Sequence, residues 1–60
     1  MTDARILVVD DEEIIRSICI RVLAREGYTT DEAGDHAATM ARLKQQRFDL
    51  VLLDLRLGIE

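Results

Sequence analysis

Two short apolar runs, each followed by aspartate, constrain the fold of this chain more than any other feature. The first, Ile6–Val9, precedes Asp10 and Asp11, and the second, Leu50–Leu53, precedes Asp54. Apolar runs of about four to eight residues between polar ones are typical of buried strands. Neither run alternates, which indicates strands covered on both faces, as in a parallel sheet beneath helices. We therefore expect two neighbouring parallel strands with the three aspartates at one edge.

The three carboxylates would lie close together in such a sheet, because neighbouring strands are about 4.8 Å apart. Carboxylates at this separation repel one another, so they would either raise each other's pKa values or need a cation. Oxygen ligands of this kind suit Mg²⁺, which keeps several waters and takes one or two carboxylates together with phosphate oxygens. The sequence therefore predicts a magnesium site with room for a phosphoryl group, formed by Asp10, Asp11 and Asp54.

The segment between the two apolar runs predicts two helices and one further strand. We expect a helix over residues 12–26 ended by Gly27, a strand over 28–33, and a helix over 36–46 capped by Asp35. The order is then β-α-β-α-β, and crossovers of this length imply parallel strands with right-handed connections. The first strand would lie between the other two, in the order 2-1-3, which creates a ligand-binding switch point at the carboxyl ends of the strands.

Each expected helix carries an apolar face that we expect to cover the sheet. The face of the first helix consists of Ile14, Ile15, Ile18, Cys19, Val22 and Leu23. The face of the second helix, largely of small residues, consists of Ala37, Ala38, Met40, Ala41 and Leu43.

Composition limits the classes of partner and location. The 60 residues carry a net charge of −4 with clustered acids, which argues against direct binding of nucleic acid. The sequence has no long apolar span and no secretory leader, so we expect a cytoplasmic protein that does not insert in a membrane. The single cysteine, Cys19, fits a reducing compartment.

The two motifs together resemble the receiver domain of bacterial two-component response regulators. The resemblance is carried by Ile6–Glu12 and by Asp49–Leu57, and it covers the first half of such a domain. It implies a three-layer, flavodoxin-like α/β fold in which residues 1–60 form a partial receiver domain. Receiver domains are signalling modules, and this one is not expected to act as an independent enzyme.

The resemblance also implies residue roles. Asp54 is similar to the phosphoacceptor, whose carboxylate attacks the phosphorus of a phosphohistidine on a sensor histidine kinase. Mg²⁺ would be held by Asp10, Asp11, Asp54 and the backbone carbonyl of Arg56. The family's later Ser/Thr and Lys would fall beyond Glu60, so phosphorylation of the 60-residue chain is expected to be impaired.

Two departures concern single positions. Gly58 stands where the family often has proline, and Lys44, the only lysine, does not match the family's lysine.

Other interpretations of the same residues stay open. Asp10 and Asp11 could serve as helix N-caps. An apolar strand ending in aspartate also occurs in P-loop ATPases and in phosphatases with an aspartate nucleophile. The sequence has neither the glycine-rich Walker A signature nor an Asp-x-Asp after a strand. A third possibility is a catalytically inactive half-domain that mainly self-associates, because an uncovered apolar edge is a template for another strand. Such a chain would dimerise edge to edge through Leu50–Leu53, exchange elements between chains, or aggregate.

Overall fold

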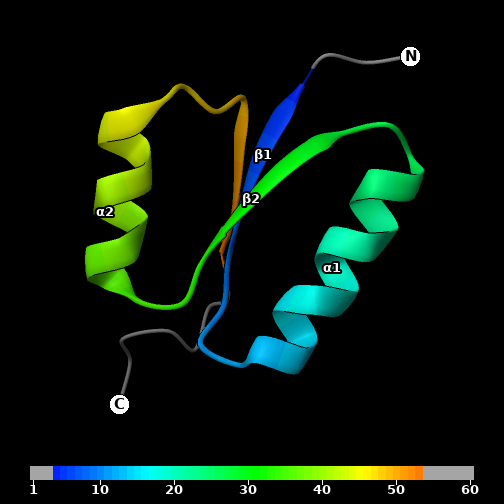
Figure 1. The fold of residues 1–60 in the computed structure, drawn as a ribbon, viewed down its shortest axis with the longest axis horizontal. Coiled ribbons are helices and arrows are strands. Elements are labelled where there is room, and N and C mark those ends of the chain that lie inside the picture. The colour runs from blue at the N-terminus through cyan, green and yellow to red at the C-terminus, as the bar shows by residue number, and fades with distance from the viewer. Residues whose placement is uncertain (1–3, 54–60) are drawn as a thin grey trace.

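A computed structural model describes residues 4–53, which form one three-stranded parallel sheet with a helix on each face (Figure 1). The elements in chain order are β1 (Arg5–Val9), α1 (Glu13–Arg25), β2 (Thr29–Ala33), α2 (His36–Gln45) and β3 (Leu50–Leu53). The strand order is β2-β1-β3, so the predicted topology and the central place of the first strand are confirmed. The predicted element bounds differ from the observed ones by one residue at most within the part described.

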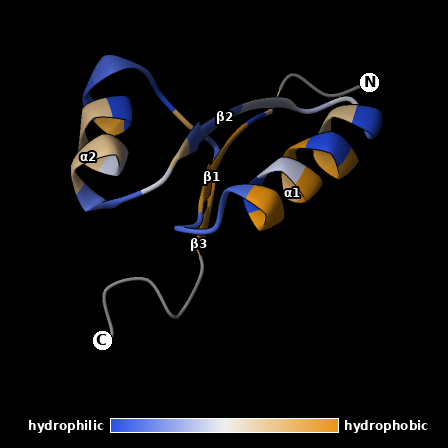
Figure 2. Cartoon of the chain, turned by 60° about the horizontal axis from the view of Figure 1, so that its bottom comes forward, coloured by the Kyte–Doolittle hydropathy of each residue, from blue (hydrophilic) through white to orange (hydrophobic). Residues whose placement is uncertain are grey.

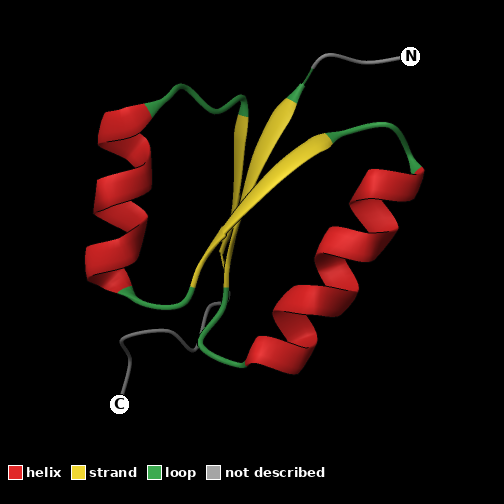
Figure 3. Ribbon diagram, in the orientation of Figure 1, coloured by secondary structure: helices red, strands yellow, loops and turns green. Residues whose placement is uncertain are grey.

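The register of the sheet aligns the carboxyl ends of all three strands. Val9 of β1 is paired with Ala33 of β2 on one side and with Leu53 of β3 on the other. The strands therefore end at one edge of the sheet (Figure 3). Asp10 follows β1 at that edge.

The core of the molecule is β1. Its residues Ile6, Leu7, Val8 and Val9 are each at most 4% exposed, as expected for a central strand covered on both faces. Leu7 and Val9 form one cluster with Ala33 of β2, against which Ala38 and Phe48 pack. Full burial of an aliphatic side chain contributes about 1.5–3 kcal/mol, so the apolar run of β1 is the main source of stability in the sheet.

Neighbouring residues of β2 show that the helices lie on opposite faces, because successive strand residues point to opposite sides of a sheet. The Asp31 carboxylate accepts a hydrogen bond from Gln46 Nε2 at 3.0 Å, on the α2 side. The Glu32 carboxylate accepts one from Arg16 Nε of α1 at 2.6 Å, on the other side. The three-layer arrangement expected from the sequence is confirmed.

The apolar face expected on α1 is mostly exposed, and that prediction was wrong. Ile14, Ile18 and Val22 have exposed fractions of 74%, 51% and 53%. The half-buried residues of α1 are Arg16, Cys19, Ile20 and Leu23. The side of α1 that faces β2 carries Arg16, which forms an ion pair with Glu32. Figure 2 shows apolar residues along much of α1.

The apolar face predicted for α2 was also wrong for most of its residues. Met40 and Leu43 are 44% and 41% exposed, whereas Ala38 and Arg42 are half-buried. Arg42 Nε lies 3.4 Å from Asp31 Oδ1, which makes an ion pair but not a hydrogen bond. Each helix therefore has one arginine paired with an acid of β2, Arg42 with Asp31 on α2 and Arg16 with Glu32 on α1.

The expectation that the second apolar run is covered on both faces was wrong for β3. Its four residues are between 39% and 55% exposed. Both helices pack mainly against β2, on the far side of β1 from β3, and β3 is hydrogen-bonded to β1 alone in the described sheet. In the described part of the chain, β3 is therefore an apolar strand with one uncovered edge. Neither helix in the part described is long and apolar enough to cross a membrane.

Candidate metal centre at the carboxyl end of the sheet

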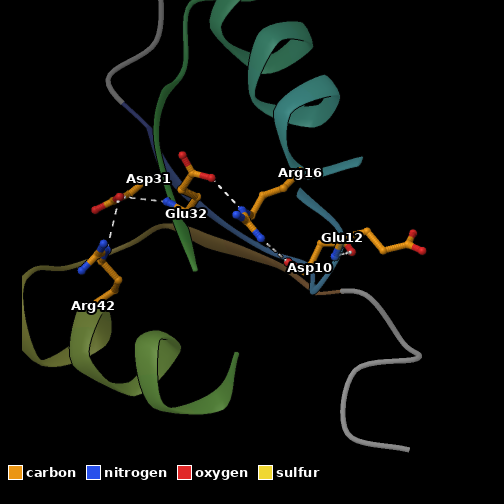
Figure 4. Close-up of polar contacts among 6 residues, drawn as sticks. All are labelled: Asp10, Glu12, Arg16, Asp31, Glu32 and Arg42. Carbon is orange, nitrogen blue, oxygen red and sulfur yellow. Dashed lines mark hydrogen bonds and ion pairs between the residues drawn. The ribbon is translucent and has the colours of Figure 1, made fainter. Parts of the chain in front are cut away.

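Asp10 occupies the end of the central strand and is held at three points. Its N–H donates to the Ala33 carbonyl at 3.2 Å, and its carbonyl accepts from Arg16 Nη1 at 2.7 Å. Its Oδ1 accepts the Glu12 N–H at 2.9 Å, which forms a tight turn between β1 and α1 (Figure 4). With an exposed fraction of 7%, Asp10 is the one buried polar or charged residue among those described.

The acid pair Asp10–Asp11 carries no cation of its own within residues 4–53. The ion pairs there join Arg16 to Glu32 and Arg42 to Asp31. A buried carboxylate without a paired cation is costly unless it is hydrogen-bonded or coordinates a metal. Asp11 follows on the same turn and is exposed, so it can present its carboxylate to an ion from solvent.

The N-cap interpretation of these acids fits the structure only loosely. Helix α1 begins at Glu13, and the N–H that Asp10 accepts belongs to Glu12, before the first helical residue. The bond therefore shapes the turn and does not satisfy an N–H inside the helix. Glu13 takes the place in the first turn where an acid complements the helix dipole.

The other two predicted ligands, Asp54 and Arg56, lie outside the described residues. Among the residues that are described, no three side chains of the His, Cys, Asp or Glu types come together as a metal site. The two carboxylates of the acid pair fit Mg²⁺ as a donor set, because this ion takes one or two carboxylates and keeps several waters. Calcium would require six to eight oxygen ligands.

Two residues at this edge were not identified as functional from the sequence. Arg16 of α1 and Glu32 of β2 meet next to the turn that carries Asp10 (Figure 4). A signal for Arg16 was present, because it shares one helix face with Ile20 and Leu23 at spacings of four and seven residues. The apolar face expected on this helix from the sequence did not include Ile20, so this half-buried side was not recognised.

A parallel sheet in the order β2-β1-β3, with an acid pair at the end of its central strand, defines a flavodoxin-like α/β module. The chain belongs to the response regulator receiver domain family, whose family model matches residues 6–59. The resemblance to receiver domains is therefore confirmed.

Individual relatives agree with this family. The transcriptional regulatory protein ResD of Bacillus subtilis is 42% identical over 62 residues, with 97% of this chain and 26% of ResD covered. Sporulation initiation phosphotransferase F of the same organism is 38% identical over 64 residues, with 100% and 52% covered. The chemotaxis response regulator CheY4 of Vibrio cholerae has a similar structure, with a TM-score of 0.88, 30% identity, and coverage of 98% of this chain and 49% of that chain. The chain thus spans about half or less of these relatives.

Proposed function

We propose that this chain accepts a phosphoryl group on Asp54 from a phosphohistidine of a sensor histidine kinase. In this proposal Mg²⁺ is held by Asp10, Asp11, Asp54 and the backbone carbonyl of Arg56. The module would act in the cytoplasm and would not be an independent enzyme, as its membership of the receiver family supports.

The register between β1 and β3 is the observation that carries the proposal. Val9 and Leu53 are paired, and they immediately precede Asp10 and Asp54 in the sequence. Parallel neighbouring strands that end in register support the expectation that the residues following them meet at one edge. The buried Asp10 carboxylate, which has no ion pair in the described region, supports a cation at that edge.

The chemistry requires little covalent help from the protein. A carboxylate oxygen of Asp54 would bond to phosphorus while the bond between phosphorus and the histidine nitrogen breaks. The products are an acyl phosphate and a neutral imidazole, whose second ring nitrogen carries the proton it had before transfer. Mg²⁺, when bound, supplies neutralisation of the charge on the transferring group. The acid pair Asp10–Asp11 would hold the cation at the end of β1. The turn that carries Asp10 is fixed there by three hydrogen bonds.

The proposal is tested by incubating the chain with Mg²⁺ and a small-molecule phosphodonor, followed by intact-mass measurement. We expect a partial gain of one phosphoryl group that is lost in Asp54→Asn and after chelation of the metal. Glu26→Gln, which changes an exposed acid at the end of α1, is the matched control and should be phosphorylated like the natural chain. Absence of any phosphoryl gain in the natural chain under saturating Mg²⁺ contradicts the proposal.

A second candidate function, self-association, is favoured by the exposure of β3. Leu50, Val51, Leu52 and Leu53 are 54%, 39%, 41% and 55% exposed, and no charged residue interrupts them. Exposed apolar strand edges pair with other chains unless charges or proline block them. We propose that two copies of the chain join through this strand.

Sedimentation equilibrium tests the second candidate. We expect a mass above that of one chain, and Val51→Lys should shift the chain toward a single copy, because lysine at a strand edge opposes pairing. Leu43→Lys, at a similarly exposed apolar residue on α2, is the control and should keep the natural association. A single-chain mass with a cooperative melt for the natural sequence excludes the dimer.

A further inference from the structure

The guanidinium of Arg16 links three elements, α1, β1 and β2, at the carboxyl end of the sheet. It extends from α1, its Nη1 donates to the Asp10 carbonyl at the end of β1 at 2.7 Å, and its Nε donates to Glu32 of β2 at 2.6 Å. The side chain of Arg16 is 17% exposed and that of Glu32 is 48% exposed. Figure 4 shows the Arg16 side chain between these two partners.

Neither of the two hydrogen bonds that Arg16 donates goes to the Asp10 carboxylate. The guanidinium donates a hydrogen bond to the main-chain carbonyl of Asp10 and forms its ion pair with Glu32. The Asp10 carboxylate has no ion pair within residues 4–53, and its Oδ1 is oriented by the Glu12 N–H. An arginine placed on the carboxylate itself would compete with a metal ion, and this arrangement avoids that competition.

We propose that Arg16 is a positioning residue for the acid pair Asp10–Asp11, an inference that rests on the proposed magnesium function. Arg16 fixes the carbonyl of Asp10 and so sets the direction in which the turn presents both carboxylates. Glu32 is the anchor that holds the guanidinium in place. Charge-assisted hydrogen bonds of this type are short and strong, and the planar fork of arginine can serve two acceptors at once, whereas lysine presents a single charged point.

Gly34 gives a second means of moving the same guanidinium. A Cβ added at Gly34 would lie 3.0 Å from Arg16 Nη1 and 3.6 Å from its Cζ. The backbone angle φ of Gly34 is not positive, since Gly27 is the one glycine with positive φ in the part of the chain described. Alanine at this position therefore displaces the arginine by a few tenths of an ångström without backbone strain.

The test compares Arg16→Met and Arg16→Lys with Arg21→Met, which removes an exposed arginine from the same helix. Two quantities are measured by NMR: the hydrogen-exchange rate of the Glu12 amide without metal, and the dissociation constant for Mg²⁺. We expect Arg16→Met to raise the exchange rate and to weaken Mg²⁺ binding about tenfold, as loss of a group that orients a metal ligand typically does. Lysine should restore binding only in part, and Arg21→Met should change neither quantity.

Each outcome decides between positioning and simple stabilisation. If Arg16→Met lowers the melting temperature but leaves both the Glu12 exchange rate and Mg²⁺ binding unchanged, the inference is overturned. If the natural chain binds no Mg²⁺, the proposed function fails, and the Glu12 exchange rate alone decides whether Arg16 holds the turn. If Arg16→Met does not fold, Glu32→Gln and Gly34→Ala keep the arginine and should each weaken Mg²⁺ binding to a smaller degree. Unchanged binding and exchange in both variants also overturn the inference.

Discussion

Arg5 and Asp49 close the amino ends of β1 and β3 through two hydrogen bonds that run in opposite directions. The Arg5 N–H donates to Asp49 Oδ2 at 2.7 Å, and the Asp49 N–H donates to the Arg5 carbonyl at 2.8 Å. The pair is separated by 44 residues in the chain. It fixes the register of β3 against β1, and that register is what aligns Val9 with Leu53 at the other end.

Removing the Asp49 carboxylate should therefore loosen β3. We expect Asp49→Ala to lower the free energy of unfolding by about 1 kcal/mol, because the hydrogen bond is charge-assisted but exposed. Asp49→Asn keeps an acceptor oxygen and should cost less. Urea denaturation followed by circular dichroism, at one fixed protein concentration, measures both values. Equal stability of the alanine variant and the natural chain contradicts this role for Asp49.

The core prediction concerns two leucines in neighbouring strands of the sheet. Leu7 is 0% exposed and Leu52 is 41% exposed, so truncation should affect them differently. Leu7→Ala removes buried methyl groups and leaves a cavity, at a cost of about 2–5 kcal/mol. A domain of this size has a stability of only a few kcal/mol, so this variant should be largely unfolded.

Leu52→Ala is the matched control, with the same change of side chain on β3. It should retain its circular dichroism spectrum and lose less free energy of unfolding than Leu7→Ala. It should also weaken self-association if β3 forms the dimer contact. Similar unfolding of both variants would indicate that β3 is covered by another part of the chain or by a second copy.

The parts of the fold that sequence could predict are those decided by local patterns and chain connectivity. The uninterrupted apolar run Ile6–Val9 identified the central strand, and two crossovers of helical length determined parallel strands in the order β2-β1-β3. The caps at Gly27 and Asp35 were also predictable, because each depends on residues within one turn of the helix end.

Two of the three errors concern how each helix is rotated about its axis, and the third concerns β3, which neither helix covers because both pack mainly against β2. An apolar periodicity assumes that a helix turns its apolar face toward the sheet. Here Glu32 and Asp31 stand on β2 beneath the helices, and they pair with Arg16 and Arg42. Such pairs join residues 16 and 11 positions apart, so helical periodicity alone could not reveal them. The acid pair of the candidate site was predicted from the sequence and stays a prediction, whereas the contact of Arg16 with the Asp10 carbonyl was not predicted, for the same reason.

The N-terminus of α2 offers a prediction about capping. Asp35 Oδ1 accepts the Ala38 N–H at 2.7 Å, and the Asp35 carbonyl accepts the Thr39 hydroxyl at 2.8 Å. Asp35→Ala removes the side-chain bond and should reduce the free energy of unfolding by about 1 kcal/mol. Asp35→Asn retains a capping oxygen and should remain close to the natural chain. An alanine variant with unchanged stability in urea denaturation would show that the cap contributes nothing.

The C-terminus of α1 depends on a left-handed glycine. Gly27 has φ of 94°, its N–H donates to the Ala24 carbonyl at 3.1 Å, and the Tyr28 N–H donates to the Leu23 carbonyl at 3.1 Å. These two bonds form a Schellman motif, which satisfies carbonyls that the helix end leaves unpaired. The motif turns the chain from α1 into β2, and it thereby places Glu32 where Arg16 can reach it.

Gly27→Ala should lower the free energy of unfolding by about 1–2 kcal/mol, because a Cβ is strained in the left-handed region. Gly27→Asn should cost less, since asparagine tolerates positive φ better than alanine. Because the Tyr28 N–H bond depends on the turn at Gly27, hydrogen exchange of the Tyr28 amide should be faster in the alanine variant than in the natural chain. In Asp35→Ala this exchange rate should be unchanged. Alanine and asparagine variants of equal stability would mean that the backbone at residue 27 relaxes out of the left-handed region at no cost.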